Sequence, residues 1–259
     1  MPHPFVEHRS GQHPTGRHPT GSPGPAEPGP PRAAPPALLG RGLVKSYGDQ
    51  GVRALDGVDV AVAAGEAVAV MGASGSGKTT LLHCLAGILP VDAGEVVVQT
   101  AAGPAHVERL SEDERSRLRR EALGFVFQQG MLVPELTACE NVALAVMLTG
   151  APRRRAEQAA APWLDALGLA GLGARRIGEL SGGQAQRVAI ARALVTGPAV
   201  VFADEPTGAL DSRTSDVVLD ALLGATTGTG RALVVVTHDP RVAARCARTV
   251  HLADGRVAR

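Results

Sequence analysis

The sequence predicts an α/β fold built around a parallel β-sheet. Three apolar segments, residues 67–71, 199–203 and 232–236, are uninterrupted runs of strand length. Such runs are typical of parallel strands that are buried on both faces. Each run is followed by polar or glycine-rich residues, and in doubly wound α/β sheets ligands bind at the carboxyl ends of the strands. Segments with helical spacing and helix-capping residues separate the runs, as an α/β fold requires.

The first apolar run leads into the pattern G-x-x-x-x-G-K-[ST], and an apolar, helix-like segment follows at 81–86. In the order strand, glycine loop, helix, this pattern predicts a phosphate site, because backbone N–H groups and the helix N-terminus face the anion. Lys78 is expected to reach the β- and γ-phosphates, and the Thr79 hydroxyl to bind Mg²⁺. A glycine-rich turn with a chance lysine is the alternative, and the flanking strand and helix count against it. The candidate residues are Gly72, Ala73, Ser74, Gly75, Ser76, Gly77, Lys78, Thr79 and Thr80.

The composition limits the classes of function. The 259 residues include 26 basic and 25 acidic side chains, and this formal charge of +1 gives no electrostatic indication of a nucleic-acid partner. No apolar run approaches the roughly 20 residues that span a bilayer. The chain is therefore expected to be soluble and to reach a membrane only through a partner. The three cysteines, Cys84, Cys139 and Cys246, lack metal-ligand spacing and are expected to be reduced thiols.

Residues 1–37 differ in composition from the rest of the chain. They are rich in proline, glycine and histidine and poor in apolar side chains, so a disordered tail is expected. The folded domain is predicted to cover 38–259. A solvated tail explains the regularly spaced histidines better than a metal site does; these are His3, His8, His13 and His18.

Within the first half of the domain, the patterns predict strands first and helices later. An edge strand at 39–47 and a second strand at 58–62 precede the apolar strand at 67–71. The helix after the glycine loop is expected to stop at Gly87. The elements that follow are a strand at 94–99, a helix from the capping box at 111–114 through Arg120, and a strand at 123–128 that ends in Gln128.

The second half is predicted to be mainly helical around the two remaining apolar strands. A capping box at 137–140 and a glycine turn at 180–184 each lead into a helix. A basic triplet at 153–155 begins another helix, which contains the only tryptophan, Trp163, as a packing residue. The predicted helices cover 141–148, 153–167, 186–194 and 213–224.

Polar side chains follow the second and third apolar strands directly. Asp204 suits a metal-coordinating carboxylate, and Glu205 beside it suits a base that accepts a proton from water. His238 follows the third strand and is a candidate for contact with a γ-phosphate. An Asp-Glu pair after a strand is usually a helix cap or a surface turn. Here the apolar strand before it and the phosphate loop favour a catalytic role.

From 38 to 259 the sequence resembles the ATP-binding subunits of ABC transporters. The resemblance rests on an aromatic residue, the Walker A loop, the Q-loop glutamine, the signature pentapeptide, Walker B, the D-loop and a histidine. It implies a P-loop NTPase fold of the ABC ATPase type, with a RecA-like core, an antiparallel β subdomain and an α-helical subdomain at about 129–185. It also implies an ATPase with ATP and Mg²⁺ as cofactors. The motifs stand in the family's order at Tyr47, 72–79, Gln128, 180–184, 204–205, 209–211 and His238.

The resemblance implies roles for single residues. Tyr47 would stack on adenine with Val52 beside it, and Gln128 would bind Mg²⁺ and sense the membrane partner. Glu205 would polarise the attacking water, and His238 would hold the γ-phosphate. In this family two copies enclose two ATP molecules, so the signature of one copy acts on the nucleotide bound by the other. The residues with roles across the two sites would be Ser181, Gly182, Gly183, Gln184 and Asp211.

A narrower resemblance concerns the segments 110–128, 134–142 and 205–211, which are similar to the branch that serves macrolide exporters and lipoprotein-release systems. It implies an ATPase that drives a separate permease, for export or for extraction from the membrane. The implied location is cytoplasmic, peripheral on the inner face of the plasma membrane. The permease selects the transported substance.

Two other functions stay open. One is a soluble ABC ATPase without transport. Translation factors of that kind carry two motif sets and this chain carries one, while DNA-repair relatives have long coiled coils, and the interval between 80 and 180 lacks sustained heptads. The other is the ATPase of a non-transporting envelope-signalling or cell-division complex, which the sequence does not separate from transport.

Overall fold

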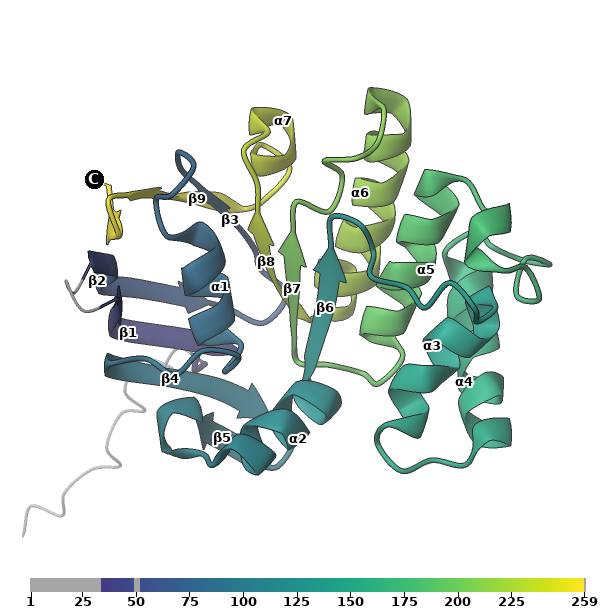
Figure 1. Ribbon diagram of the computed structural model, residues 1–259, viewed down its shortest axis with the longest axis horizontal. Helices are drawn as coiled ribbons and strands as arrows, with labels where there is room; N and C mark the ends of the chain where they lie inside the picture. The colour runs from purple at the N-terminus through teal and green to yellow at the C-terminus, as the bar shows by residue number, and fades with distance from the viewer. Residues whose placement is uncertain (1–33, 49–51, 259) are drawn as a thin grey trace, which may run out of the picture. The chain divides into compact units, whose positions relative to one another are not determined.

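The computed structural model describes residues 34–48 and 52–258, which form two β-sheets and the helices packed on them (Figure 1). Residues 1–33 of the predicted tail lie outside the described part. Ala37, the last residue assigned to the tail, is buried, and its carbonyl accepts the N–H of Gln99 at 2.9 Å. The boundaries of the tail, the domain and the helical subdomain stay predictions.

The smaller sheet is antiparallel, with the strand order β2-β1-β4-β5. The strand predicted at 39–47 is β1, but the prediction of an edge strand was wrong. Leu38 on β1 pairs with Val62 on one side and with Val98 on the other, and all three side chains are buried. Pairing with β4 is a long-range contact that the local pattern of β1 does not contain. The strands are β1 (Leu38–Tyr47), β2 (Val52–Val62), β4 (Ala93–Thr100) and β5 (Gly103–His106).

The larger sheet has the strand order β10-β9-β3-β8-β7-β6. The three predicted apolar strands are its neighbouring members β3, β8 and β7, and they are parallel, as predicted. Val236 on β8 pairs with Val70 on one side and with Asp204 on the other, so the three strands end at one edge of the sheet. The strands are β3 (Ala67–Met71), β6 (Leu123–Phe127), β7 (Val200–Asp204), β8 (Ala232–Val236), β9 (Arg248–Ala253) and β10 (Arg256–Val257).

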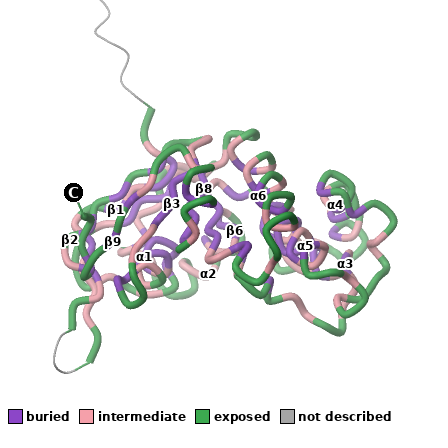
Figure 2. Tube along the Cα trace, turned by 90° about the horizontal axis from the view of Figure 1, so that it is seen from above, coloured by how far each residue is buried: buried purple, intermediate pink, exposed green. Residues whose placement is uncertain are grey.

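Two hydrophobic clusters cover the two faces of the larger sheet, and both are visible as buried segments in Figure 2. Side chains alternate between the faces of a strand. Val234 and Val236 of β8 accordingly join the cluster with the smaller sheet and α1, whereas Leu233 and Val235 join the cluster with the helices on the opposite side. The helices are α1 (Lys78–Leu85), α2 (Glu112–Ala122), α3 (Ala138–Met147), α4 (Arg153–Ala166), α5 (Gly182–Leu194), α6 (Ser212–Thr226) and α7 (Pro240–Ala243).

Both predicted capping boxes are confirmed, because Ser111 bonds reciprocally with Glu114 and Thr137 with Glu140. Helix α5 begins earlier than predicted, at Gly182, because the signature itself forms the first helical turn. The sequence patterns did not predict β5, β9, β10 and α7, which are short or follow the last predicted strand. Within the described residues, no helix is long and apolar enough to cross a bilayer.

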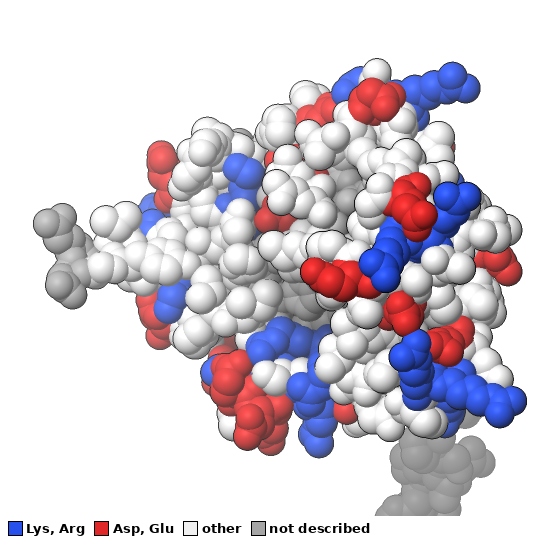
Figure 3. All heavy atoms as spheres, turned by 45° about the vertical axis from the view of Figure 1, so that its right-hand side comes forward, with Lys and Arg blue, Asp and Glu red and all other residues white. Residues whose placement is uncertain are grey.

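The three thiols are free, and none of them is fully exposed. Burial raises the pKa of Cys84 and of Cys246 to about 11 in each case, so both thiols stay protonated at neutral pH. On the face shown in Figure 3, basic and acidic side chains are interspersed and do not gather into one basic area. This distribution accords with the formal charge of +1.

Candidate functional site

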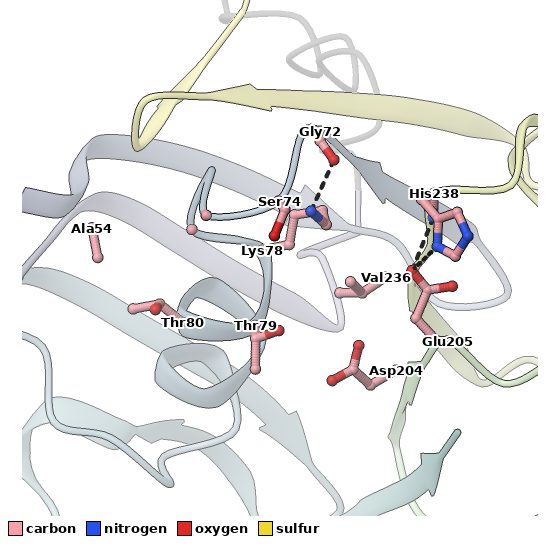
Figure 4. Close-up of a pocket in the computed structure, with 12 residues that line it drawn as sticks. Ala54, Gly72, Ser74, Lys78, Thr79, Thr80, Asp204, Glu205, Val236 and His238 are labelled. Carbon is pink, nitrogen blue, oxygen red and sulfur yellow. Dashed lines mark hydrogen bonds and ion pairs between the residues drawn. The ribbon is translucent and has the colours of Figure 1, made fainter. Parts of the chain in front are cut away.

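A cavity of about 420 Å³ lies at the carboxyl edge of the larger sheet (Figure 4). Parallel strands place their carboxyl ends side by side, so the loops after β3, β7 and β8 meet there. The sequence predicts this meeting for the phosphate loop, Asp204, Glu205 and His238. Ala54 and Val236 also line the cavity, and no motif in the sequence marks their apolar side chains as part of a site. The lining residues are Ala54, Gly72, Ser74, Gly75, Gly77, Lys78, Thr79, Thr80, Asp204, Glu205, Val236 and His238.

The phosphate loop wraps around the N-terminus of α1. Gly77 is the N-cap residue and has a φ of 101°, a conformation that favours glycine. The ammonium of Lys78 donates to the carbonyl of Gly72 at 2.8 Å and to the carbonyl of Ala73 at 2.7 Å. Seven of the nine predicted loop residues line the cavity, and the exceptions are Ala73 and Ser76. The Ser76 hydroxyl is buried and has no hydrogen-bond partner among the described residues.

Glu205 is held toward the cavity by the residues at the end of β8. Its backbone N–H donates to the carbonyl of Val236 at 2.9 Å, and its φ of 46° is unusual for a residue with a side chain. One carboxylate oxygen accepts the backbone N–H of His238 at 3.0 Å and lies 2.6 Å from its Nδ1. The other oxygen accepts the Thr237 hydroxyl at 3.3 Å. This arrangement fixes the direction of the carboxylate and leaves the His238 side chain 75% exposed.

Asp204 ends β7 beside Glu205. Burial raises the pKa of Asp204, and the negative charge of Glu205 raises it further, while His83 and Lys78 act in the opposite direction. In Figure 4 the Asp204 carboxylate and the Thr79 hydroxyl face each other across the cavity. Both are hard oxygen donors of the kind that Mg²⁺ prefers. A bound cation would offset the negative charges of Asp204 and Glu205, which lie side by side at this edge.

Replacing Asp204 with asparagine is expected to raise the Tm of the nucleotide-free protein at pH 7, by about 2–4 °C for each kcal/mol of destabilisation that is removed. The raised pKa means that the folded state disfavours the ionised carboxylate relative to the unfolded chain. Ionised Asp204 therefore lowers stability above its folded pKa. The advantage of the variant should shrink as the pH falls and wild-type Asp204 becomes protonated. Calorimetry from pH 4 to pH 8 measures the difference, and a pH-independent or lower Tm would contradict the prediction.

Gln128 lies outside the cavity. It is exposed after the end of β6, and its amide nitrogen lies 3.0 Å from where a Cβ on Gly208 would be. Helix α5 holds the loop that contains it. The buried Gln186 side chain donates to the carbonyl of Phe127 at 2.9 Å, and the guanidinium of Arg192 donates to the two carbonyls at 130 and 131 at 2.6 Å each. Neither polar side chain was singled out in the sequence, because no local pattern marks a contact across some sixty positions.

Tyr47 and Val52 face each other as a residue pair of β1 and β2. Their side chains are 45% and 65% exposed, and neither lines the cavity, whereas Ala54 on the same strand as Val52 does. The structure thus brings the two predicted adenine contacts together at the exposed end of the antiparallel sheet.

The signature residues form the N-terminus of α5. Ser181 is the N-cap, and its backbone and side chain bond reciprocally with Gln184. Gly183 packs so closely on α6 that a Cβ would lie 2.2 Å from Thr214. Asp211 is the N-cap of α6, and hydrogen bonds from the Thr214 hydroxyl and backbone lower the pKa of its carboxyl group. Ser181 and Gly183 line a hollow of about 210 Å³ that shares no residue with the phosphate cavity.

Residues 55–208 match the family described as ABC transporter. The lipoprotein-releasing system ATP-binding protein LolD of Bordetella avium is 46% identical over 228 residues, which are 85% of this chain and 95% of that protein. The chain belongs to the ABC transporter ATPase family. The macrolide export ATP-binding/permease protein MacB 1/2 of Paracoccus denitrificans is also 46% identical, over 84% of this chain but 32% of that protein.

Solved structures of ABC cassettes have the same fold. The cassette MJ0796, described as dimeric in a post-hydrolysis state with ADP and Pi, is 37% identical and superposes with a TM-score of 0.76 over 86% of this chain and 97% of its own length. The protein cbiO1 of Clostridium perfringens, part of the transporter complex cbiONQ, is 27% identical with a TM-score of 0.77, over 87% of this chain and 88% of its own. The predicted P-loop NTPase fold is confirmed. As a member of the ABC family, the chain is an ATP-binding subunit that hydrolyses ATP with Mg²⁺.

Proposed function

We propose that this ABC ATPase drives a separate membrane permease of the lipoprotein-release and macrolide-export branch. The observation that carries the ATP-hydrolysing part of the proposal is the carboxylate of Glu205, which His238 and Thr237 orient toward a cavity bounded by the phosphate loop. The permease would use the energy of ATP hydrolysis to export a substance or to extract it from the membrane. The relatives named LolD and MacB support this branch.

In the proposed reaction the β- and γ-phosphates of ATP lie over the N-terminus of α1. Lys78 and the loop N–H groups would neutralise the phosphate charge. The Thr79 hydroxyl and Asp204 would hold Mg²⁺, which would supply positive charge to the transferred phosphoryl group. Glu205 accepts a proton from the attacking water, and His238 contacts the γ-phosphate. The remaining proposed Mg²⁺ ligand is Gln128, which has to move into the cavity because it lies outside it.

A second copy of the chain is proposed to complete each site. Ser181 and Gly183 open onto their own hollow, and that hollow shares no lining residue with the phosphate cavity of the same copy. The free N-terminus of α5 suits a phosphate bound by another subunit. The relative MJ0796 is described as dimeric, which supports the pairing of two copies. Tyr47 and Val52 are proposed to contact adenine, and Asp211 to connect the two sites.

The permease is proposed to dock in an apolar groove of about 400 Å³ next to the loop of Gln128. The groove lies between β6 and α2 on one side and α3 and α5 on the other, and Ile88, Phe125 and Leu148 contribute its apolar surface. Leu148 is 59% exposed, a large apolar side chain without cover. Phe127, immediately before Gln128, also lines the groove. Docking there would place the chain on the inner face of the plasma membrane.

The test is co-purification with the permease that the neighbouring gene is expected to encode, after expression of both chains. Leu148→Glu is expected to reduce the amount of permease recovered by at least about tenfold, because an ionised carboxylate would lose its hydration in the groove. Basal ATPase activity should not change. Met147→Glu is the matched control, since Met147 is the preceding residue, is 39% exposed and does not line the groove. Equal recovery with the two variants would contradict the docking site.

A further inference from the structure

The C-terminal hairpin, residues 248–257, lies against the phosphate loop. β9 pairs in parallel with β3 as far as Met71, which pairs with His251, so β9 continues beside the loop that begins at Gly72. Figure 4 shows the yellow strand of this hairpin passing next to Gly72. None of the residues to which the family resemblance assigns a role belongs to the hairpin.

The hairpin touches the phosphate loop at two backbone positions. The N–H of Gly255 donates to the carbonyl of Ser76 at 3.2 Å. At the other end of the loop, the carbonyl oxygen of Leu252 lies 2.2 Å from where a Cβ on Gly72 would be. The hairpin therefore lies directly against the loop at both positions, and a side chain at Gly72 would collide with its backbone.

Strand β2 lies on the other side of the hairpin turn. The carbonyl oxygen of Ala54, a residue of the cavity wall, lies 2.3 Å from a Cβ position on Gly77 and 2.9 Å from one on Gly255. The N–H of Asp56 donates to the carbonyl of Gly255 at 2.8 Å. Gly255 thus contacts the phosphate loop through its N–H and β2 through its carbonyl.

An ion cluster ties β10 to β2 at the same place. The Nε of Arg256 lies 2.9 Å from one carboxylate oxygen of Asp56, and its terminal nitrogen lies 2.5 Å from the same oxygen. Arg53 contacts the other oxygen at 2.5 Å. The turn itself consists of Asp254 and Gly255, with φ values of 48° and 74°, as in the tight turns that join two antiparallel strands.

We propose that the C-terminal hairpin holds the phosphate loop in its phosphate-binding conformation, and that Gly255 and Arg256 are positioning residues for ATP. This inference rests on the proposed role of the loop. A site made of backbone N–H groups binds an anion well only when those groups already point to one place. The hairpin contacts the loop and does not reach the carboxylate of Glu205. Its loss should therefore weaken nucleotide binding and raise KM while kcat stays unchanged.

Calorimetric titration of the whole protein with Mg²⁺ and ADP tests the proposal. Arg256→Ala is expected to weaken ADP binding about threefold to fivefold, the scale of one exposed ion pair. Arg248→Ala is the matched control, because Arg248 begins β9, the other strand of the hairpin, at the end away from the loop, and pairs with Glu66 at 2.7 Å. The control should lower the Tm comparably and leave affinity within about twofold. Arg256→Lys, which keeps the charge, should recover part of the affinity.

Gly255→Ala is expected to disturb the contacts of the hairpin turn with Ser76 and Ala54 more strongly than Arg256→Ala does. The added Cβ would lie 2.9 Å from the Ala54 carbonyl oxygen, and a φ of 74° is strained for alanine. We expect a loss of affinity of about tenfold or more, since both faces of the turn would shift. If this variant does not fold, the difference in ADP affinity between Arg256→Ala and Arg248→Ala tests the role of the hairpin.

The outcomes separate this inference from the proposed phosphate site. Unchanged affinity in Arg256→Ala, or equal losses in Arg256→Ala and Arg248→Ala, would overturn the role of the hairpin while Lys78→Ala still weakens binding. If the wild type does not bind ADP, or Lys78→Ala binds it as well as the wild type, the proposed site itself fails. A fall in kcat without a rise in KM would also overturn the positioning role.

Discussion

The Glu205→Gln variant is expected to bind ATP as the wild type does and to hydrolyse it at least about 100-fold more slowly, the contribution typical of a general base. Glutamine keeps the size and the hydrogen-bonding oxygen of the side chain but does not accept a proton from water at neutral pH. Because hydrolysis normally ends the closed state of the proposed dimer, the variant should accumulate as a nucleotide-bound dimer. Phosphate release measures the first effect, and size-exclusion chromatography with ATP measures the second.

Asp239→Asn is the matched control for this variant. Asp239 is close in the chain to His238 and carries a carboxylate, but that carboxylate pairs with Arg241 at 2.8 Å and does not line the cavity. The control should keep near-normal hydrolysis. Near-normal turnover by Glu205→Gln would contradict the assignment of the base, and equal losses in both variants would indicate a general effect of removing a charge at this edge.

The Lys78→Ala variant is expected to lose nucleotide affinity itself, by about 10- to 100-fold. A hydrogen bond to a charged group is worth about 1.5–3 kcal/mol, which corresponds to this range. The ammonium bonds to the carbonyls of Gly72 and Ala73 within the loop, and Lys78 lines the cavity. Calorimetric titration with ATP measures the loss.

Arg41→Ala serves as the control for Lys78→Ala. Arg41 pairs with Glu95 on the antiparallel sheet and does not line the cavity. It should bind ATP normally. Lys78→Arg should stay weak despite its charge, because a planar guanidinium does not reproduce a compact ammonium inside the loop. Unchanged ATP affinity in Lys78→Ala would count against the phosphate loop, whatever the result with Glu205→Gln.

The sequence predicted best where local pattern and tertiary structure agree. The three apolar strands are parallel neighbours because each is apolar along its whole length and needs cover on both faces. The capping boxes at Ser111 and Thr137 form as predicted because a capping box involves residues only three positions apart. The signature is a third capping box, because Ser181 bonds reciprocally with Gln184. The prediction of a turn before the helix was wrong there, since the two glycines at 182 and 183 are typical of a turn.

Predictions failed or were missing where distant segments meet. β1 was expected at an edge, and its pairing with β4 puts it inside the sheet. Gln186 and Arg192 reach back to the loop of Gln128 and carry no local signal of that contact. The hairpin around Gly255 was not predicted as an element, although it contacts both Ser76 and Ala54.

By itself, then, the sequence determined the fold class and the chemical groups at the carboxyl edge, from Lys78 and Thr79 to Asp204 and Glu205. These depend on residue type, short spacing and strand polarity, which are properties of neighbouring positions. Only the tertiary structure decided which of those groups share a cavity, that Gln128 and the signature lie outside it, and that the end of the chain lies behind the phosphate loop. The physical reason is that such contacts are selected by the packing of the whole core, and packing joins positions that no local pattern connects.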